Sequence, residues 1–410
     1  MFSWIRKVRL VVTGVIVINN ANEKKYRWYP HEKEGGHILK VLSLFSGIGA
    51  FERALENLHA PYELIAYCEI DKYASHAYSI LHGVPETKNL GDITKIDVSK
   101  LPTDIDLLTY GFPCQDISVA GRGKGLVHEG TQTRSGLVWD AHKIIEATKP
   151  KIAICENVKN LVGKKFTAEF KAILDNLEEL GYMNYWQVLN ACDYGIPQNR
   201  ERVFIVSIRK DLKKKFEFPA PVPLNLRLKD LLEPVVEEKY YINPKQIKKI
   251  VFTKKNDGIV IVGNTKSGGE KSAILSPNGI VSCLTATCYK QPKQIIQIAN
   301  IHPTATRDNP NQGRVYDTNG IAPTLNCKGG GGLEAHIMEV TNSENYMTNE
   351  NVDFPFRIRK LTPTEYFRCM GFNDDDVNKL RDAGISNTQL YKMAGNSIVV
   401  DVLMAIFKEL

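Results

Sequence analysis

Between residues 38 and 209, short apolar runs alternate with amphipathic stretches. The apolar runs have the length of strands, and they read ILKVLSLF, ELIAYCE, IDLLTY, KIAICE, YWQVLN and RVFIVSI. Helical spacing of apolar positions marks residues 50–58, 72–81, 137–147 and 166–180. This alternation predicts an α/β domain with a mostly parallel, doubly wound sheet. The last two runs have no helix-length segment between them, which favours an antiparallel pair at one edge.

The pattern changes after the proline-rich segment FPAPVP at residues 218–223. Glycine, asparagine, threonine and short β-like runs dominate up to about residue 354, and the chain then becomes helical again. The final helical stretch is strongly amphipathic, so we expect it to pack on the first domain. These changes predict a first domain at 38–222, a smaller β-rich domain inserted at 223–355, and C-terminal helices at 356–410 that complete the first domain.

The inserted segment contains a weak internal repeat. ILSPNGIVSCLTATC resembles VYDTNGIAPTLNCKG, and each copy carries an Asn-Gly pair between apolar residues. Such pairs are strong hairpin signals. The repeat indicates either two similar hairpins or two related recognition lobes, which would read two distinct targets.

Composition and charge narrow the class of protein. The 410 residues are 43% hydrophobic and 24% charged, which is typical of globular domains. The formal net charge is +7, and residues 239–300 hold ten lysines against two acids. A charge run is usually a solvated face, but on a turn-rich module it favours contact with a phosphate backbone. The eight cysteines have neither C-x-x-C pairing nor zinc spacing, so we expect reduced cytosolic thiols and no metal site.

The first twenty residues imitate a secretory signal, with a basic start and the apolar run LVVTGVIVI. No small-residue cleavage site follows, and the run is too short to span a bilayer. We interpret residues 1–37 as an extra strand or an extension outside the functional domain. The remaining chain lacks a membrane-length apolar stretch, and we expect a cytoplasmic protein.

Candidate chemistry lies where the predicted strands end. VLSLFSGIGAFERAL reads as a strand, a glycine turn and a helix, and Glu69 follows Gly49 by twenty residues. At that spacing, a carboxylate can bind the hydroxyls of a ribose. The third glycine of a dinucleotide-binding turn is absent, which favours a nucleotide without pyrophosphate, such as S-adenosylmethionine. Cys114, Glu156 and the pair Arg200 and Arg202 end three other strands. Each alone would usually be structural, but together they offer a nucleophile, an acid and two anion binders at one sheet edge.

The ordered motifs make the resemblance specific. From about residue 38 to 410 the chain resembles a DNA cytosine-5 methyltransferase of the prokaryotic or phage type, with a Rossmann-like domain and an inserted target-recognition domain. The motifs that carry the resemblance are FSGIGAF, YCEID, GDI, GFPCQ, ENV, QNRER, RKLTPTEYFRCMGF and AGNS. Residues 1–37 lie outside it.

The resemblance implies a mechanism and a set of site residues. Cys114 would add to carbon 6 of a flipped cytosine, Glu156 would protonate or bind ring nitrogen 3, Arg202 would hold the carbonyl oxygen, and Arg200 would support the site or the phosphates. The loop from residue 115 to 136 would close as a lid. Other implied contacts with the substrate are Gln115, Ser118, Asn157 and Gln198.

The implied cofactor is S-adenosylmethionine. Phe45 would stack on adenine, Gly47 and Gly49 would lie near the methionine part, Glu69 would bind ribose and Asp92 the adenine amine. Further cofactor positions are Ile93, Pro113, Leu137 and Asn396, the last closing the site. Ile70 departs from the family, which often has an aromatic residue there, and this weakens the expected stacking on adenine.

Three readings compete. The leading one is a monomeric, sequence-specific enzyme acting on double-stranded DNA, in a restriction–modification system with a cognate endonuclease or in anti-restriction. The second is a transfer-RNA cytosine methyltransferase of the same fold, which has less need of a large turn-rich module. The third is a catalytically inactive DNA-binding scaffold, which the intact set of Cys114, Glu156 and Arg202 disfavours.

Overall fold

The structure is a computed structural model, and it describes residues 38–117, 125–128, 131–241 and 356–410. Between residues 242 and 355 it describes only short strands. Residues 1–37, Ser118 and both Asn-Gly pairs therefore lie outside the described residues, and the interpretations attached to them stay predictions.

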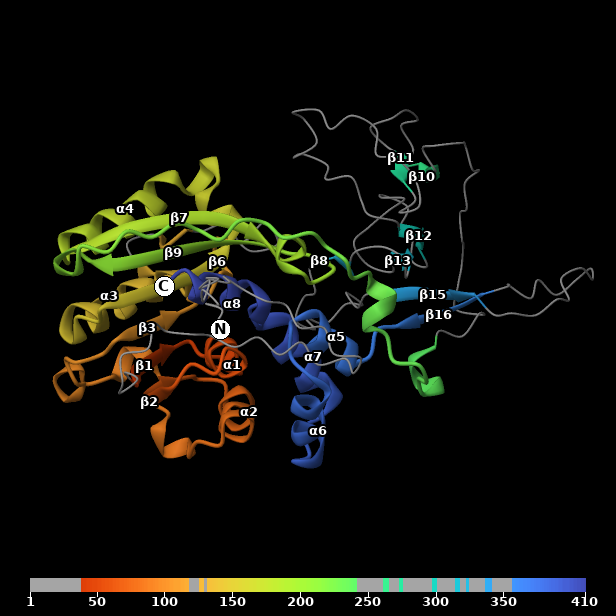
Figure 1. The fold of residues 1–410 in the computed structure, drawn as a ribbon, viewed down its shortest axis with the longest axis horizontal. Helices are drawn as coiled ribbons and strands as arrows, with labels where there is room; N and C mark the ends of the chain where they lie inside the picture. Colours follow the sequence, from red (N-terminus) through yellow and green to blue (C-terminus); the bar gives the residue numbers. More distant parts are fainter. Residues whose placement is uncertain are drawn as a thin grey trace, which may run out of the picture.

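A six-stranded sheet forms the centre of the molecule (Figure 1). Its order is β2 (Tyr62–Cys68), β1 (Leu39–Leu44), β3 (Leu107–Tyr110), β6 (Ile152–Val158), β9 (Glu201–Arg209) and β7 (Tyr182–Asn190). The first four strands run parallel, whereas β9 is antiparallel to both of its neighbours. The predicted mostly parallel sheet with an antiparallel pair at one edge is confirmed.

Helices cover both faces of this sheet, because successive residues of each buried strand point to opposite sides. Val41 and Leu107 face a core shared with α1 (Ala50–Asn57), α2 (Lys72–His82) and α8 (Val400–Lys408). Their neighbours Leu42 and Leu108 face the other core, which α3 (Val138–Thr148) and α4 (Thr167–Glu179) cover. The four helices predicted in this part of the chain are present, with no end shifted by more than one residue.

The C-terminal segment folds as α5 (Pro363–Cys369), α6 (Asp374–Asp382), α7 (Asn387–Asn396) and α8. The last of these packs on α1, where the Phe51 and Phe407 ring centroids are 6.3 Å apart. Within the described residues, the stretch Asn387–Lys408 alone is long and apolar enough to cross a membrane, but 72% of its 18-residue apolar window is buried inside the protein. We therefore assign it to the core.

The remaining strands are short. β4 (Val127–His128) and β5 (Thr131–Gln132) pair within the loop that follows Gln115, and β8 (Gln198–Asn199) pairs with β14 (Ala322–Pro323). A four-stranded sheet has the order β12 (Gln297–Asn300), β13 (Arg314–Asp317), β15 (His336–Val340) and β16 (Phe356–Lys360), and a two-stranded sheet joins β10 (Ile261–Asn264) to β11 (Ala273–Leu275). The β-rich character expected after residue 223 is present in these strands.

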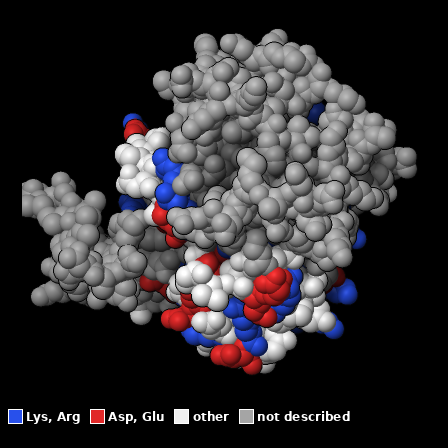
Figure 2. All heavy atoms as spheres, turned by 90° about the vertical axis from the view of Figure 1, so that its right-hand side faces the viewer, with Lys and Arg blue, Asp and Glu red and all other residues white. Residues whose placement is uncertain are grey.

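Figure 2 shows one end of the molecule, where the acidic and basic side chains that the structure describes are intermixed. Helix α6, at this end, illustrates the mixture with Asp374 and Asp375 in its first turn and Lys379 and Arg381 in its last. This order of charges complements the helix dipole. Most of the lysines of residues 239–300 lie outside the described residues, so the described surface says little about a basic face.

A buried ion pair anchors the start of the C-terminal segment. The guanidinium of Arg359 makes two parallel 2.8 Å hydrogen bonds to Glu365, and both side chains are fully buried. The same carboxylate accepts hydrogen bonds from the backbone N–H groups of Thr362 and Glu233. Glu365 thus joins α5, β16 and the linker that leaves the first domain.

Replacement of Glu365 by alanine should destabilise the protein strongly, because it removes the bidentate carboxylate partner of the fully buried Arg359 guanidinium. We expect a loss of about 3–5 kcal/mol in the free energy of unfolding, measured by urea denaturation. Asp175→Ala is the matched control, since it breaks the exposed Lys171–Asp175 pair and should cost about 0.5 kcal/mol or less. Equal losses in the two variants would contradict the anchoring role of Glu365.

Candidate active site

Three adjacent strands bring the predicted chemical groups together. Cys114 lies four residues beyond the end of β3, Glu156 lies within β6, and Arg202 lies near the start of β9. These strands are consecutive in the sheet. Tyr110 of β3 pairs with Cys155 of β6, so the loop carrying Cys114 begins opposite Glu156.

Glu156 and Arg202 form an ion pair, with Nε of Arg202 3.0 Å from Oε1 of Glu156. Glu156 is directly opposite Phe204 in the antiparallel ladder, so Arg202 is its diagonal neighbour on the same face. Burial raises the pKa of Glu156 above its ordinary value, and the positive charges of Arg202 and Arg200 only partly offset this. The carboxyl group is therefore easier to protonate than a surface glutamate.

The thiol of Cys114 is half-buried beside this pair. Burial raises its pKa, and the charge of Glu156 raises it further, while Arg202 and Arg200 act in the opposite direction. The resting side chain is therefore a thiol at neutral pH, and its conversion to a thiolate depends on the charges around it.

Asparagine side chains fix the loop that carries the thiol. The amide of Asn157 donates to the carbonyl oxygen of Phe112 at 2.9 Å, and that of Asn160 donates to Ile117 at 2.5 Å. Asn157 is 2% exposed, so it holds the loop from within. Asn157 thus helps to position this loop, and its expected contact with the substrate stays a prediction.

Arg200 and Gln198 tie this edge of the sheet to the C-terminal segment. Arg200 donates to the carbonyl oxygens of Gly395 and Ser397 at 3.2 and 2.7 Å and is only 4% exposed. Gln198 is fully buried and donates to the carbonyl oxygen of Cys369 at 2.7 Å. Of the two roles expected for Arg200, these contacts favour support of the site over phosphate binding. Gln198 thus connects this edge of the sheet to the C-terminal segment, and its expected contact with the substrate stays a prediction.

Gln115 and Asp116, at the start of the predicted lid, each bond a residue near its other end, but Gln115 is exposed and Asp116 is buried. Gln115 is exposed and its amide oxygen accepts a 2.8 Å hydrogen bond from Arg134. Asp116 is buried and exchanges hydrogen bonds with Ser135, just before Leu137. Asp116 is a position that the sequence analysis missed, and its place directly after the PCQ run was the available signal.

On the other side of the sheet, Glu69 holds the glycine turn. Its carboxylate accepts a 2.8 Å hydrogen bond from the N–H of Gly47 and a 2.7 Å one from the N–H of Asp71. Burial raises the pKa of Glu69, although these two backbone donors lower it in part. Asn89, also missed from the sequence, bonds both backbone groups of Glu69 and the N–H of Gly91. Strand β2 and the GDI motif are thus held together.

The residues around this turn fit an adenosyl cofactor. Phe45 adopts a left-handed φ of 51°, a strained conformation that non-glycine residues take mainly at functional sites. A Cβ on Gly47 would meet nothing within 4 Å, so its backbone borders open space. Ile70 is 75% exposed, an apolar surface at the strand end, and Asp92 is a carboxylate whose pKa the hydroxyl of Thr94 lowers. An aromatic ring, an apolar side chain and carboxylates suit adenine and ribose.

Gly49 lies against the buried side chain of His82. Its φ is 78°, and a Cβ there would lie 2.1 Å from Nε2 of His82. The absence of a side chain at Gly49 makes room for this histidine, and the expected place of Gly49 near the methionine part of the cofactor stays a prediction.

The other predicted cofactor positions border the same edge. Ile93 is buried, Pro113 and Leu137 are half-buried, and Asn396 is exposed at the end of α7. An ion pair between Lys392 of α7 and Asp71, the N-cap residue of α2, connects this helix to the β2–α2 turn. No cluster of metal-ligating side chains occurs among the described residues.

The fold and this site define an α/β methyltransferase of the Rossmann-like class. The chain is similar in fold to a DNMT2 methyltransferase variant from Spodoptera frugiperda, with a TM-score of 0.59 and 17% identity over 90% of this chain and 98% of that one. A putative DNA modification methyltransferase of an E. coli prophage gives a TM-score of 0.54 with 19% identity over 90% and 98%.

Residues 39–410 match the family described as C-5 cytosine-specific DNA methylase, and the chain belongs to this family. It is 34% identical to the orphan methyltransferase M.SPRI of Bacillus phage SPR, over 91% of this chain and 97% of that protein. It is 33% identical to the type II methyltransferase M.HhaI of Haemophilus parahaemolyticus, over 90% and 93%. The chain is therefore a DNA cytosine-5 methyltransferase that uses S-adenosylmethionine, as the sequence predicted.

The charges around Cys114 predict how fast its thiol reacts. Glu156→Gln removes a negative neighbour, so the pKa of Cys114 should fall and alkylation by iodoacetamide at pH 8 should accelerate about three- to tenfold. Arg202→Ala should slow it, because a positive neighbour is lost. The rate is measured by mass spectrometry of the peptide that contains Cys114.

Glu201→Gln is the control for this measurement, since Glu201 pairs with Lys159 on the surface. Its rate should equal that of the unmodified protein. Slower alkylation in Glu156→Gln would show that the carboxylate does not act on the thiol as described.

Proposed function

We propose that Cys114 is the nucleophile of the methylation reaction and that Glu156 and Arg202 act on the target cytosine. The observation that carries the proposal is the ion pair between Glu156 and Arg202, half-buried next to the Cys114 thiol. The cofactor supplies the methyl group as an electrophilic sulfonium. The thiolate of Cys114 forms a bond to carbon 6 of the base, which makes carbon 5 nucleophilic, and this bond breaks again when the carbon-5 proton leaves.

Glu156 and Arg202 share the charge that develops on the ring. Arg202 donates to the carbonyl oxygen of the base, and in doing so it turns away from Glu156. The carboxyl group then loses its counter-ion in a buried place, which raises its pKa further and favours the protonated form. Protonated Glu156 can donate to ring nitrogen 3, the atom that gains electron density when the thiolate adds.

We also propose that residues 223–355 form an inserted target-recognition domain. The backbone pairing of β14 with β8 supports this, because it joins Ala322 of the insert to Gln198, a few residues before Arg202. A recognition module attached there can align a DNA motif with the base pocket. Since a paired cytosine is out of reach of Cys114, the base must flip out of the duplex.

The biological role that we propose is modification of double-stranded DNA by a monomeric cytoplasmic enzyme, with or without a cognate endonuclease. The similar proteins include orphan phage methyltransferases and type II methyltransferases, which supports either setting. Activity on transfer RNA and an inactive DNA-binding scaffold are outcomes that the following experiment separates.

DNA from a methylation-free host that expresses this chain should show methylated cytosine at one short fixed motif in bisulfite sequencing. Cys114→Ser should abolish the signal, because serine is a far weaker nucleophile. Cys192→Ser, at another half-buried cysteine, should retain it. Two unrelated motifs would favour two recognition lobes. Methylated transfer RNA without methylated DNA would overturn the DNA assignment, and no methylation in either nucleic acid would favour the scaffold.

A further inference from the structure

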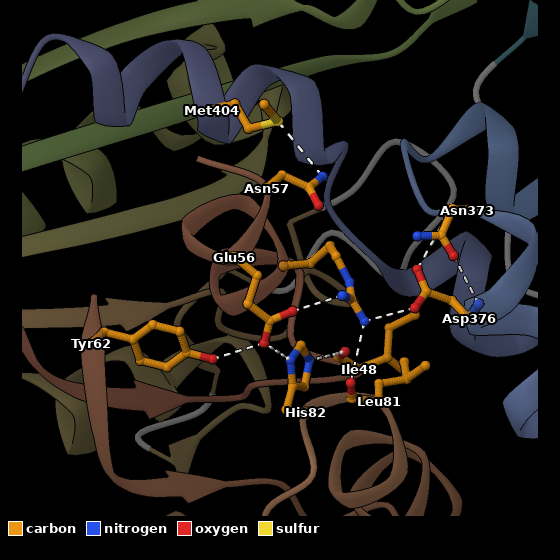
Figure 3. A network of polar contacts seen from close by, with 10 residues as sticks. Ile48, Glu56, Asn57, Tyr62, Leu81, His82, Asn373, Asp376 and Met404 are labelled. Carbon is orange, nitrogen blue, oxygen red and sulfur yellow. Dashed lines mark hydrogen bonds and ion pairs between the residues drawn. The ribbon is translucent and has the colours of Figure 1, made fainter. Parts of the chain in front are cut away.

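A buried polar network lies behind the glycine turn (Figure 3). Its centre is His82, the last residue of α2, whose side chain is fully buried. Nδ1 of His82 lies 2.7 Å from a carboxylate oxygen of Glu56, and Nε2 lies 3.0 Å from the carbonyl oxygen of Ile48. Ile48 stands between Gly47 and Gly49, so this contact reaches the turn itself.

The partners of His82 define its charge. The carbonyl oxygen of Ile48 can only accept a hydrogen bond. Glu56 also accepts from Tyr62 at 2.9 Å and pairs with Arg53 at 2.7 Å. Burial alone would raise the pKa of Glu56, but the hydrogen bond and charge of His82, with the charge of Arg53, lower it overall. Glu56 is thus an ionised acceptor, and two acceptors require a proton on both nitrogens of the ring.

The ring is confined in a single orientation. The Tyr78 ring lies against it with a centroid distance of 4.7 Å, and Gly49 leaves no side chain in its way. Arg53 continues the network by bonding the carbonyl oxygen of Leu81 and the carboxylate of Asp376 in α6. The network therefore connects the turn to the C-terminal segment.

We propose that His82, as an imidazolium, is a positioning residue that fixes the Ile48 carbonyl and thereby the backbone of the cofactor-binding turn. The inference rests on the assignment of the turn around Gly47 to the cofactor site. His82 does not touch the cofactor. It acts by keeping the N–H of Gly47 and the neighbouring Glu69 in the geometry that binds it.

Loss of the proton on His82 would turn one of its two hydrogen bonds into a contact between two lone pairs. The charged or titratable groups that face it are Glu52, Arg53 and Glu56 from α1, Tyr62 from β2, Tyr78 from α2 and Asp376 from α6. Burial raises the pKa of Glu52 and of Asp376, so both carboxyl groups are easier to protonate than exposed ones.

The test is calorimetric binding of S-adenosylmethionine to the full chain between pH 6 and pH 9. We expect the Kd of the unmodified protein to increase as pH rises. In His82→Gln, which can keep at most one of the two hydrogen bonds, the Kd at low pH should increase roughly tenfold or more, and the Kd should change less with pH than in the unmodified protein. His76→Gln is the matched control, because His76 lies on the same helix and pairs with Glu86 on the surface.

Glu56→Gln supplies a second variant, because it removes the charged acceptor that faces Nδ1 of His82, and it should weaken binding in the same direction as His82→Gln. Circular dichroism melting shows whether each variant is folded. A Kd that does not change with pH in the unmodified protein, or a folded His82→Gln that binds as tightly as His76→Gln, would overturn the inference.

Glu69→Ala separates this inference from the assignment of the site. If Glu69→Ala weakens binding and His82→Gln does not, the cofactor site stands and the role of His82 fails. If Glu69→Ala has no effect, the cofactor is bound elsewhere and the site assignment itself fails.

Discussion

One hydrophobic core is built from both ends of the chain, and the rest of the structure depends on it. The sheet is buried on both faces, and the face towards α1 is covered in part by α8, the last helix. Phe407 and Ile406 from the end of the chain share that core with Phe51 and Val41 from its beginning. Without α8 this face would expose apolar strand residues to water, so the first domain cannot be complete before the C-terminal segment has folded back.

This packing places the two sides of the site against a common support. Lys392 pairs with Asp71 beside the glycine turn, Arg53 pairs with Asp376, and Arg200 bonds carbonyl oxygens at the end of α7. All three contacts join residues that are far apart in sequence. The three contacts involve charged side chains. The apolar core already brings their residues together, so these contacts position the groups of the site and do not determine the fold.

The sequence predicted the parts of this site that depend on strand order. Strands β3 and β6 end at the sheet edge where the antiparallel β9 begins, so Cys114, Glu156 and Arg202 converge there. The sequence did not predict which polar side chains turn inward. Gln198 and Asn157 stand in motifs that imply chemistry, but both are buried and bond backbone carbonyls. Only the three-dimensional arrangement shows that Gly49 makes room for His82, since the two are more than thirty residues apart.

Glu56 and Glu156 are both partly buried, and they differ in the number of donors that surround the carboxylate. Glu56 receives Arg53, His82 and Tyr62, and its pKa falls below the ordinary value despite burial. Glu156 has Arg202 as its one ion-pair partner among the residues that the structure describes, and its pKa remains raised. A carboxylate that receives three donors, two of them able to carry positive charge, is held as an anion and keeps its neighbours in place. A carboxylate with a single ion-pair partner that can move away is able to gain a proton. The proposed mechanism needs this, because the protonated carboxyl group donates to ring nitrogen 3 of the cytosine as that atom gains electron density.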